Sequence, residues 1–329
     1  MSHFITVPIN ENGIIFDSDM NDVVKEAVLA DPFRFEDIFV YSHGWSTDAY
    51  RAMDEYNRFS TDLAKRLLLI EAAAQPVLTA PPRNSLGVGI HWPSEITEDP
   101  QSALNNAQLF TFYAMEHRAD AVGKNAVYSL LRLMLTARAD SELRLRIFLL
   151  GHSFGCKVIC AALHDLQTDI GNGTIQVPVS LSFRVVLLQP ATDDDNLEPS
   201  DIYGHMVELN EIRLLITKSS EDKALNTWYP LASKIANLFH GDKARRALGA
   251  TGPTGPTIAA FGGVDSVSVV AGFSVGDMLA HTAKLVVADL SPVHKYRENG
   301  KVYDGGFSGS HSDINFGEVY DMTIGFFYA

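Results

Sequence analysis

The 329-residue sequence has little cysteine, few basic residues and no long apolar run. Its two cysteines, Cys156 and Cys160, are four residues apart in a stretch of helical character, so we expect two small buried side chains and not a disulfide or a metal site. No apolar run reaches the roughly 18 residues of a spanning helix, and the first residues lack the basic and apolar regions of a signal peptide. We therefore expect a cytoplasmic protein without a membrane span.

The charge is also one-sided, with 26 Lys and Arg against 40 Asp and Glu and a net charge of −14. Binding to nucleic acid or to an anionic membrane depends on clustered cations, so neither partner is expected. The sequence has no His, Asp and Glu cluster with metal-ligand spacing, and no G-x-G-x-x-G segment that opens a helix. We expect no metal, no cofactor and a small neutral or cationic substrate.

The sequence does have the pattern of an α/β fold. Six short apolar runs, each followed by a polar break and a stretch of helical periodicity, predict a mostly parallel sheet with helices on both faces. The runs cover 37–41, 86–90, 146–150, 183–188, 212–216 and 284–288. Helices are expected over 49–73, 107–137 and 158–166, with a closing helix at 316–327.

The longest stretch without a clear strand lies ahead of the last of these runs, at 226–283. It includes a segment rich in Gly and Pro at 249–257, which we expect to be a flexible loop. Long excursions inside compact domains are usually lids or insertions. We therefore expect 1–329 to be a single domain enlarged by a lid or insertion at 226–283.

The clearest chemical motif is a G-x-S-x-G segment, G-H-S-F-G at 151–155, between a predicted buried strand and a predicted helix. A serine hydroxyl is a weak nucleophile, and a tight strand-to-helix turn exposes it beside the positive end of the helix. Glycine is needed at both ends of the motif because side chains there would collide with neighbouring elements. Ser153 is the predicted nucleophile, and the alternative is a glycine-rich turn with a capping serine.

The run that ends at Tyr41 continues into Ser42, His43, Gly44 and Trp45. Together with the G-H-S-F-G motif, this His-Gly-x loop resembles the α/β-hydrolase superfamily, and in particular its serine esterases and lipases. The resemblance covers nearly the whole chain in element order, but its specific motifs are confined to short segments. It implies an α/β-hydrolase fold, with an oxyanion hole made of the backbone N–H groups of Trp45 and Phe154.

The resemblance also implies that the catalytic acid and then the histidine follow the nucleophile in the chain. Asp222, in a Ser-x-x-Asp segment after the run 212–216, resembles the acid of the family. Glu221 is its nearest rival. The acidic run Asp193, Asp194, Asp195 is a further alternative, although a solvated cluster at the start of a helix is the simpler interpretation.

Two histidines follow the last predicted strand, His294 and His311. We prefer His311 because the histidine of the family lies on a loop immediately before the final helix, and His294 stays open as the alternative. The base needs one imidazole nitrogen within about 2.6–3.2 Å of the serine oxygen and the other bonded to the carboxylate.

Aromatic and histidine side chains at the ends of predicted strands suggest where a substrate would bind, because open α/β sheets collect ligands at the carboxyl ends of their strands. An aromatic-rimmed pocket and ordinary packing of the indole rings are equal interpretations here. The candidate pocket residues are His43, Gly44, His152 and Trp92.

The sequence therefore predicts a serine hydrolase that cleaves carboxylic esters through an acyl-enzyme, with neutral small-molecule esters as the first substrates to consider. Amidase, thioesterase and acyltransferase chemistry would use the same residues. A non-catalytic binding protein on the same fold is the alternative from another class, because a fold does not determine a function.

Overall fold

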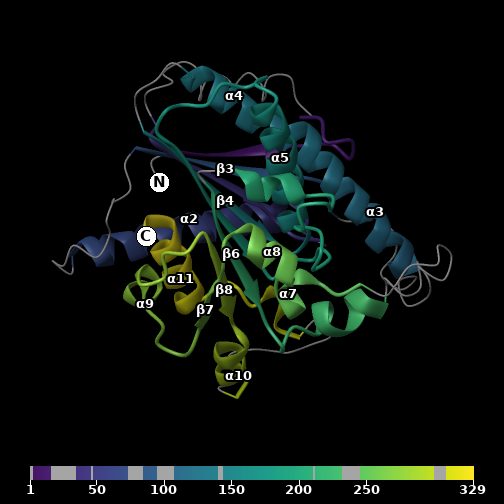
Figure 1. The fold of residues 1–329 in the computed structure, drawn as a ribbon. Helices are drawn as coiled ribbons and strands as arrows, with labels where there is room; N and C mark the ends of the chain where they lie inside the picture. Colours follow the sequence, from purple (N-terminus) through teal and green to yellow (C-terminus); the bar gives the residue numbers. More distant parts are fainter. Residues whose placement is uncertain are drawn as a thin grey trace.

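The protein was analysed as a computed structural model. It describes residues 3–15, 35–45, 47–72, 84–94, 107–139, 144–209, 212–231, 245–299 and 309–329. Figure 1 shows these residues as a central sheet between two layers of helices. The α/β class predicted from the apolar runs is confirmed.

The sheet has eight strands in the order β1-β3-β2-β4-β5-β6-β8-β7, and every neighbouring pair is parallel. The strands are β1 (His3–Pro8), β2 (Asp37–Ser42), β3 (Ser85–His91), β4 (Leu145–His152), β5 (Leu181–Leu188), β6 (Ile212–Lys218), β7 (Asp265–Ser268) and β8 (Leu285–Asp289). All six predicted runs are strands. The sequence missed β1 and β7, the two edge strands.

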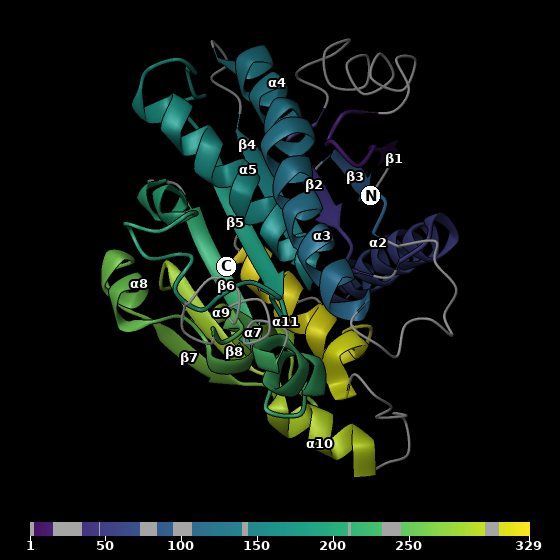
Figure 2. The ribbon, with the colours of Figure 1, turned by 90° about the vertical axis from the view of Figure 1, so that its right-hand side faces the viewer.

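The helices divide between the two faces of the sheet (Figures 1 and 2). One face carries α3 (Ala107–Val122), the π-helical turn η2 (Gly123–Val127), α4 (Tyr128–Arg138) and α5 (Phe154–Gly171). The other carries α2 (Ala49–Ala72), α9 (Val275–Leu279) and α11 (Gly317–Tyr328). The shorter elements are η3 (Gly204–Glu208), η4 (Ala224–Trp228), α7 (Leu248–Thr251), α8 (Gly255–Ala260), α10 (Ser291–Asn299) and η5 (Gly309–Ser312).

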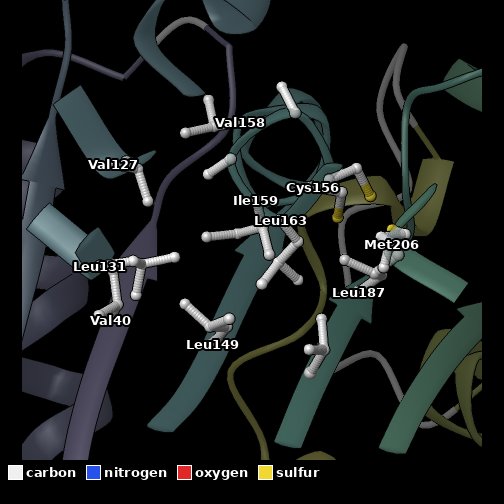
Figure 3. Packing of buried hydrophobic residues seen from close by; sticks show 14 of the residues in the cluster. Val40, Val127, Leu131, Leu149, Cys156, Val158, Ile159, Leu163, Leu187 and Met206 are labelled. Carbon is white, nitrogen blue, oxygen red and sulfur yellow. The ribbon is translucent and has the colours of Figure 1, made fainter. Parts of the chain in front are cut away.

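Alternation along the central strands gives each layer its own apolar core. On β2, Ile38 and Val40 belong to the cluster under α5, whereas Phe39 and Tyr41 belong to the cluster under α2 and α11. Successive side chains of a strand point to opposite faces, so a strand covered on both faces is apolar at most of its positions. Figure 3 shows strand residues such as Val40 below the helical side chains of the first cluster.

Both cysteines lie in the first cluster, on α5, and Figure 3 shows Cys156 among its apolar neighbours. Cys156 and Cys160 are free thiols and fully buried. Burial raises the pKa of Cys160 to about 12, so this thiol stays protonated at neutral pH. The prediction of two small buried side chains is confirmed.

The described part of the segment 226–283 has more regular structure than the sequence predicted. Its Gly- and Pro-rich part was predicted to be a flexible loop, but it contains the short helices α7 and α8, with a proline in the first turn of α8. Backbone hydrogen bonds fix α7 against the loop after β5, from Leu248 N to Thr192 O at 2.8 Å and from Gly249 N to Pro190 O at 3.0 Å. Strand β7 and helix α9 follow. Residues 232–244 lie outside the described residues, so a lid or insertion within a single domain stays a prediction.

The strand order places two loops side by side at the carboxyl edge of the sheet. From β2 the chain continues to β3 on one side, and from β4 it continues to β5 on the other side. Ser42 at the end of β2 is in register with Gly151 near the end of β4. The crevice between two such neighbouring strands is where open α/β sheets bind ligands.

Candidate active site

Ser153 occupies a strained turn between β4 and α5. Its backbone has φ 55° and ψ −122°, and a non-glycine residue with positive φ is uncommon. A Cβ atom at Gly151 would lie 2.6 Å from Cys156 Cα, and one at Gly155 would lie 2.1 Å from Ser42 O. Only glycine fits at these two positions, so the motif supplies the shape of the turn as well as its hydroxyl group.

His311 connects Ser153 to Asp222 through both of its ring nitrogens. Its Nε2 lies 2.8 Å from Ser153 Oγ, and its Nδ1 lies 2.7 Å from Asp222 Oδ2. Because a carboxylate only accepts hydrogen bonds, Nδ1 carries the proton and Nε2 accepts from the serine hydroxyl. The structure thus joins the serine, histidine and aspartate named from the sequence in one chain of hydrogen bonds.

Asp222 is fully buried and is held by three hydrogen bonds. Besides His311, Leu225 N donates to Oδ1 at 2.9 Å and Gln189 Nε2 donates to Oδ2 at 3.1 Å. A buried carboxylate needs such donors to remain charged. Gln189 was not among the residues predicted from the sequence, although a polar residue directly after a buried strand is a usable signal.

The loop after β2 lies against Ser153. A Cβ atom at Gly44 would be 2.9 Å from Ser153 Cβ, so only a glycine lets the loop approach this closely. The Trp45 ring packs edge-on against the Phe154 ring, with the centroids 6.3 Å apart. Phe154 is the first residue of α5. The two residues predicted to form the oxyanion hole are therefore neighbours beside Ser153.

The comparison with protein-family models matches residues 24–252 to a family described as an alpha/beta hydrolase of unknown function (DUF900). The match spans more than half of the chain. The chain belongs to this family. Ser153 and Asp222 lie inside the matched residues of this α/β hydrolase, and His311 lies beyond them. The comparisons with curated proteins and with solved structures gave no match.

His294, the other candidate base, is bound elsewhere in the hydrolase. Its Nε2 donates to Asp313 O at 3.1 Å, and its Nδ1 accepts from Ser219 Oγ at 2.8 Å. The side chain is 1% exposed, and burial lowers its pKa. Both ring nitrogens are therefore engaged with groups other than Ser153.

The rival acids also have other partners. Glu221 forms an ion pair with Lys295 at 3.4 Å. Asp193 accepts hydrogen bonds from Tyr229 and Arg245, and Asp194 pairs with Arg246 at 3.1 Å.

Asp193 and Asp194 are buried, so the interpretation of the acidic run as a solvated cluster at a helix start is wrong for both. Their carboxylates tie the loop after β5 to the segment that leads into α7. In Asp195, the third residue of the run, the backbone carbonyl accepts the N–H of Glu198 in a turn, at 2.8 Å.

Two of the candidate pocket residues, His43 and Trp92, form a buried layer behind the loop that follows β2. Their rings stack with centroids 5.4 Å apart and 4° between the planes, and neither side chain is exposed. Trp92 N donates to His43 Nε2 at 3.3 Å, and His43 Nδ1 donates to Gly44 O at 2.8 Å. These two rings support the loop beside Ser153 and offer no surface to a substrate.

His152 connects three parts of the site. It precedes Ser153, and its Nε2 donates to the backbone carbonyl of His311 at 2.9 Å. Its Nδ1 would lie 3.3 Å from a Cβ atom at Gly44, so the ring also packs against the loop after β2. His152 is 7% exposed and therefore contributes more to holding these loops than to a pocket wall.

The buried histidines His43 and His152 should make the folded protein less stable in mild acid. Burial lowers the pKa of His43 to about 3 and the pKa of His152 to about 4, from 6.5 in an exposed chain. Between about pH 6.5 and pH 4 the unfolded chain binds protons that the folded chain does not. The free energy of unfolding should therefore fall by about 2 kcal/mol per histidine between pH 7 and pH 5.

Urea unfolding of the wild type and of His152→Asn at the two pH values measures this effect. The variant should be less stable than the wild type at pH 7, by a margin about 2 kcal/mol larger than at pH 5. His117→Asn, on an exposed position of α3, is the control. A margin for His152→Asn that does not change with pH would contradict the prediction.

In the described part of the chain, no group of three or more His, Cys, Asp or Glu side chains is arranged to hold a metal ion. The helices described there are also too short or too polar to cross a membrane.

Proposed function

We propose that the protein is a serine hydrolase that cleaves carboxylic esters through an acyl-enzyme. The observation that carries the proposal is the hydrogen-bonded chain from Ser153 Oγ through His311 to Asp222, with distances of 2.8 and 2.7 Å. Membership of an α/β-hydrolase family supports it. The strained turn at Ser153 supports it as well, because strain at a single residue is typical of functional sites.

In the proposed first step, Ser153 Oγ attacks the carbonyl carbon of the ester and its proton passes to His311 Nε2. The electron pair of the C=O bond moves to the carbonyl oxygen. When the tetrahedral intermediate collapses, the ester C–O bond breaks and His311 returns the proton to the leaving alcohol. Asp222 remains ionised throughout and stabilises the imidazolium.

The second step repeats the chemistry with water. His311 takes a proton from a water molecule that attacks the acyl-enzyme, and then gives it to Ser153 Oγ as the carboxylic acid leaves. The backbone N–H groups of Phe154 and Trp45 are the proposed donors to the oxyanion in both steps. The positions of Phe154 and Trp45 support this assignment. Phe154 begins a helix directly after Ser153, and Gly44 lets the loop that carries Trp45 approach Ser153.

Neutral esters are the proposed substrates. The net charge of −14 disfavours the approach of anionic substrates, since like charges raise the energy of encounter. Amides, thioesters and acyl transfer to alcohols would use the same triad, so a substrate series must decide among them.

A fluorophosphonate probe tests the proposal directly. Such a probe phosphonylates an activated serine, and mass spectrometry of the digested protein should locate the adduct on Ser153. The labelled protein should lose its hydrolysis of p-nitrophenyl esters in proportion to the adduct, and a series from acetate to decanoate should then define the acyl length.

Absence of labelling, together with no hydrolysis across the ester series, would overturn the proposed function and favour a binding protein on the hydrolase fold. Labelling with hydrolysis of anilides or thioesters in place of esters would retain the triad and correct the substrate class.

A further inference from the structure

We propose that Gln189 is a positioning residue that holds Asp222 and the turn bearing His311 in one arrangement, an inference that rests on the proposed function. Gln189 directly follows β5, and its side chain is not exposed. Its Nε2 donates to Asp222 Oδ2 and to Ser310 O, both at 3.1 Å. One amide group therefore contacts the acid and the residue next to the base.

The two contacts join segments that are distant in the sequence. Asp222 is 33 residues from Gln189, and Ser310 is 121 residues away. The turn that carries His311, η5, is also fixed by Ser310 N donating to Glu221 O at 3.2 Å. Gln189 thus completes a link between the end of β5, the loop after β6 and the turn before α11.

The orientation of the amide follows from its neighbours. Asp222 Oδ2 and Ser310 O are both acceptors, so the NH₂ end of Gln189 must face them and a reversed amide would oppose acceptor to acceptor. Oδ2 is also the oxygen that binds His311 Nδ1. The neutral amide of Gln189 therefore fixes the orientation of the Asp222 carboxylate by a hydrogen bond.

The backbone of Gln189 is shaped to aim this side chain. Its φ is 44°, in the left-handed region that non-glycine residues rarely adopt. The N–H of Gln189 donates to Thr217 Oγ1 at 2.8 Å, which stabilises the bend. Backbone strain of this kind persists where the surrounding structure holds it in place, here through Thr217 of β6, and such residues are common at functional sites.

Stability alone does not account for a glutamine here. Among the described residues, Gln189 Oε1 has no hydrogen-bond partner although it is buried, and an unmatched buried acceptor lowers stability. An apolar residue of the same volume would avoid this loss. The donor end is the part of the side chain that the site uses.

The test compares Gln189→Met with the wild type in ester hydrolysis and in the rate of fluorophosphonate labelling. Methionine keeps the volume and removes both donors. We expect kcat to fall by about 10²-fold with little change in KM, because a misplaced acid and base slow the chemical step without altering substrate contacts. Gln189→Glu, which sets an acceptor against Asp222, should lose at least as much.

Asn196→Leu is the matched control. Asn196 is 1% exposed, its Oδ1 also lacks a partner among the described residues, and its Nδ2 donates to Thr192 Oγ1 at 2.7 Å, away from the triad. The control measures the loss of stability from removing a buried amide, and its kcat should stay within about 3-fold of the wild type.

A double-mutant cycle separates positioning from general destabilisation. If Gln189 acts through Asp222, then Gln189→Met should change the labelling rate by less than about 3-fold once Asp222→Asn is present. Equal losses in both backgrounds, or a single variant within about 3-fold of the wild type, would overturn the inference. A wild type that neither hydrolyses esters nor takes the probe would overturn the proposed function, and this inference with it.

Discussion

If the proposed function is correct, replacement of Ser153 by alanine is expected to lower kcat for ester hydrolysis by about 10⁶-fold, as loss of the nucleophile does in a serine protease. Ser153 Oγ is the atom 2.8 Å from His311 Nε2, and alanine has no group that can form the acyl-enzyme. The measurement is the steady-state hydrolysis of the best p-nitrophenyl ester, with fluorophosphonate labelling as a second readout. Both should disappear together.

The fold should survive this change, because alanine carries the same Cβ atom as serine and leaves the backbone strain at φ 55° unaltered. Thermal unfolding and circular dichroism should match the wild type. Ser219→Ala is a matched control, since Ser219 is also buried and hydrogen-bonded to a histidine, His294. Full hydrolysis by Ser153→Ala, or its loss in Ser219→Ala alone, would place the nucleophile elsewhere.

The second large effect is expected for Asp222→Asn, which should reduce kcat by about 10⁴-fold. Asparagine fills the same space but is neutral, so it no longer stabilises a protonated His311 and no longer requires the proton at Nδ1. An amide NH₂ facing the ring would favour the tautomer with its proton on Nε2, which cannot accept the serine proton. KM should change little, because Asp222 is buried behind His311.

Glu221→Gln is the control for this prediction. Glu221 is the adjacent acid, and its carboxylate pairs with Lys295 at the surface. Removing that charge should leave kcat within about 3-fold of the wild type. The opposite result, a large loss for Glu221→Gln and a small one for Asp222→Asn, would make Glu221 the acid and refute the assignment.

Much of the fold could be predicted from the sequence because the central strands are buried on both faces. The run 185–188 is apolar and buried at every position, and this pattern is visible without a structure. Strand β7 has no such pattern. Its four residues, Asp265 to Ser268, alternate between partly buried and exposed at the edge of the sheet. An edge strand forms because it pairs with its neighbour, here β8, and its own residues do not show this pairing.

The site was predictable where local sequence sets local shape. The turn at Ser153 needs glycine at fixed positions, so a five-residue motif is enough to predict it. The proposed acid and base are brought together by long-range contacts, and the sequence therefore left Glu221 and His294 open beside Asp222 and His311. Gln189 was missed for the same reason, because its contacts with Asp222 and Ser310 span 33 and 121 residues.

The closeness of Gly155 to Ser42 O bears on how this hydrolase can be engineered. At that point the start of α5 lies directly on the backbone of β2, so the distance between Ser153 and the loop of Gly44 depends on main chain and not on side-chain packing. Substitutions at exposed positions nearby, such as Trp45 at 37% exposure, should therefore leave this distance intact. Under the proposed function, a library that randomises Trp45 and keeps 42–44 and 151–155 constant can search for new substrate preferences without moving the turn at Ser153.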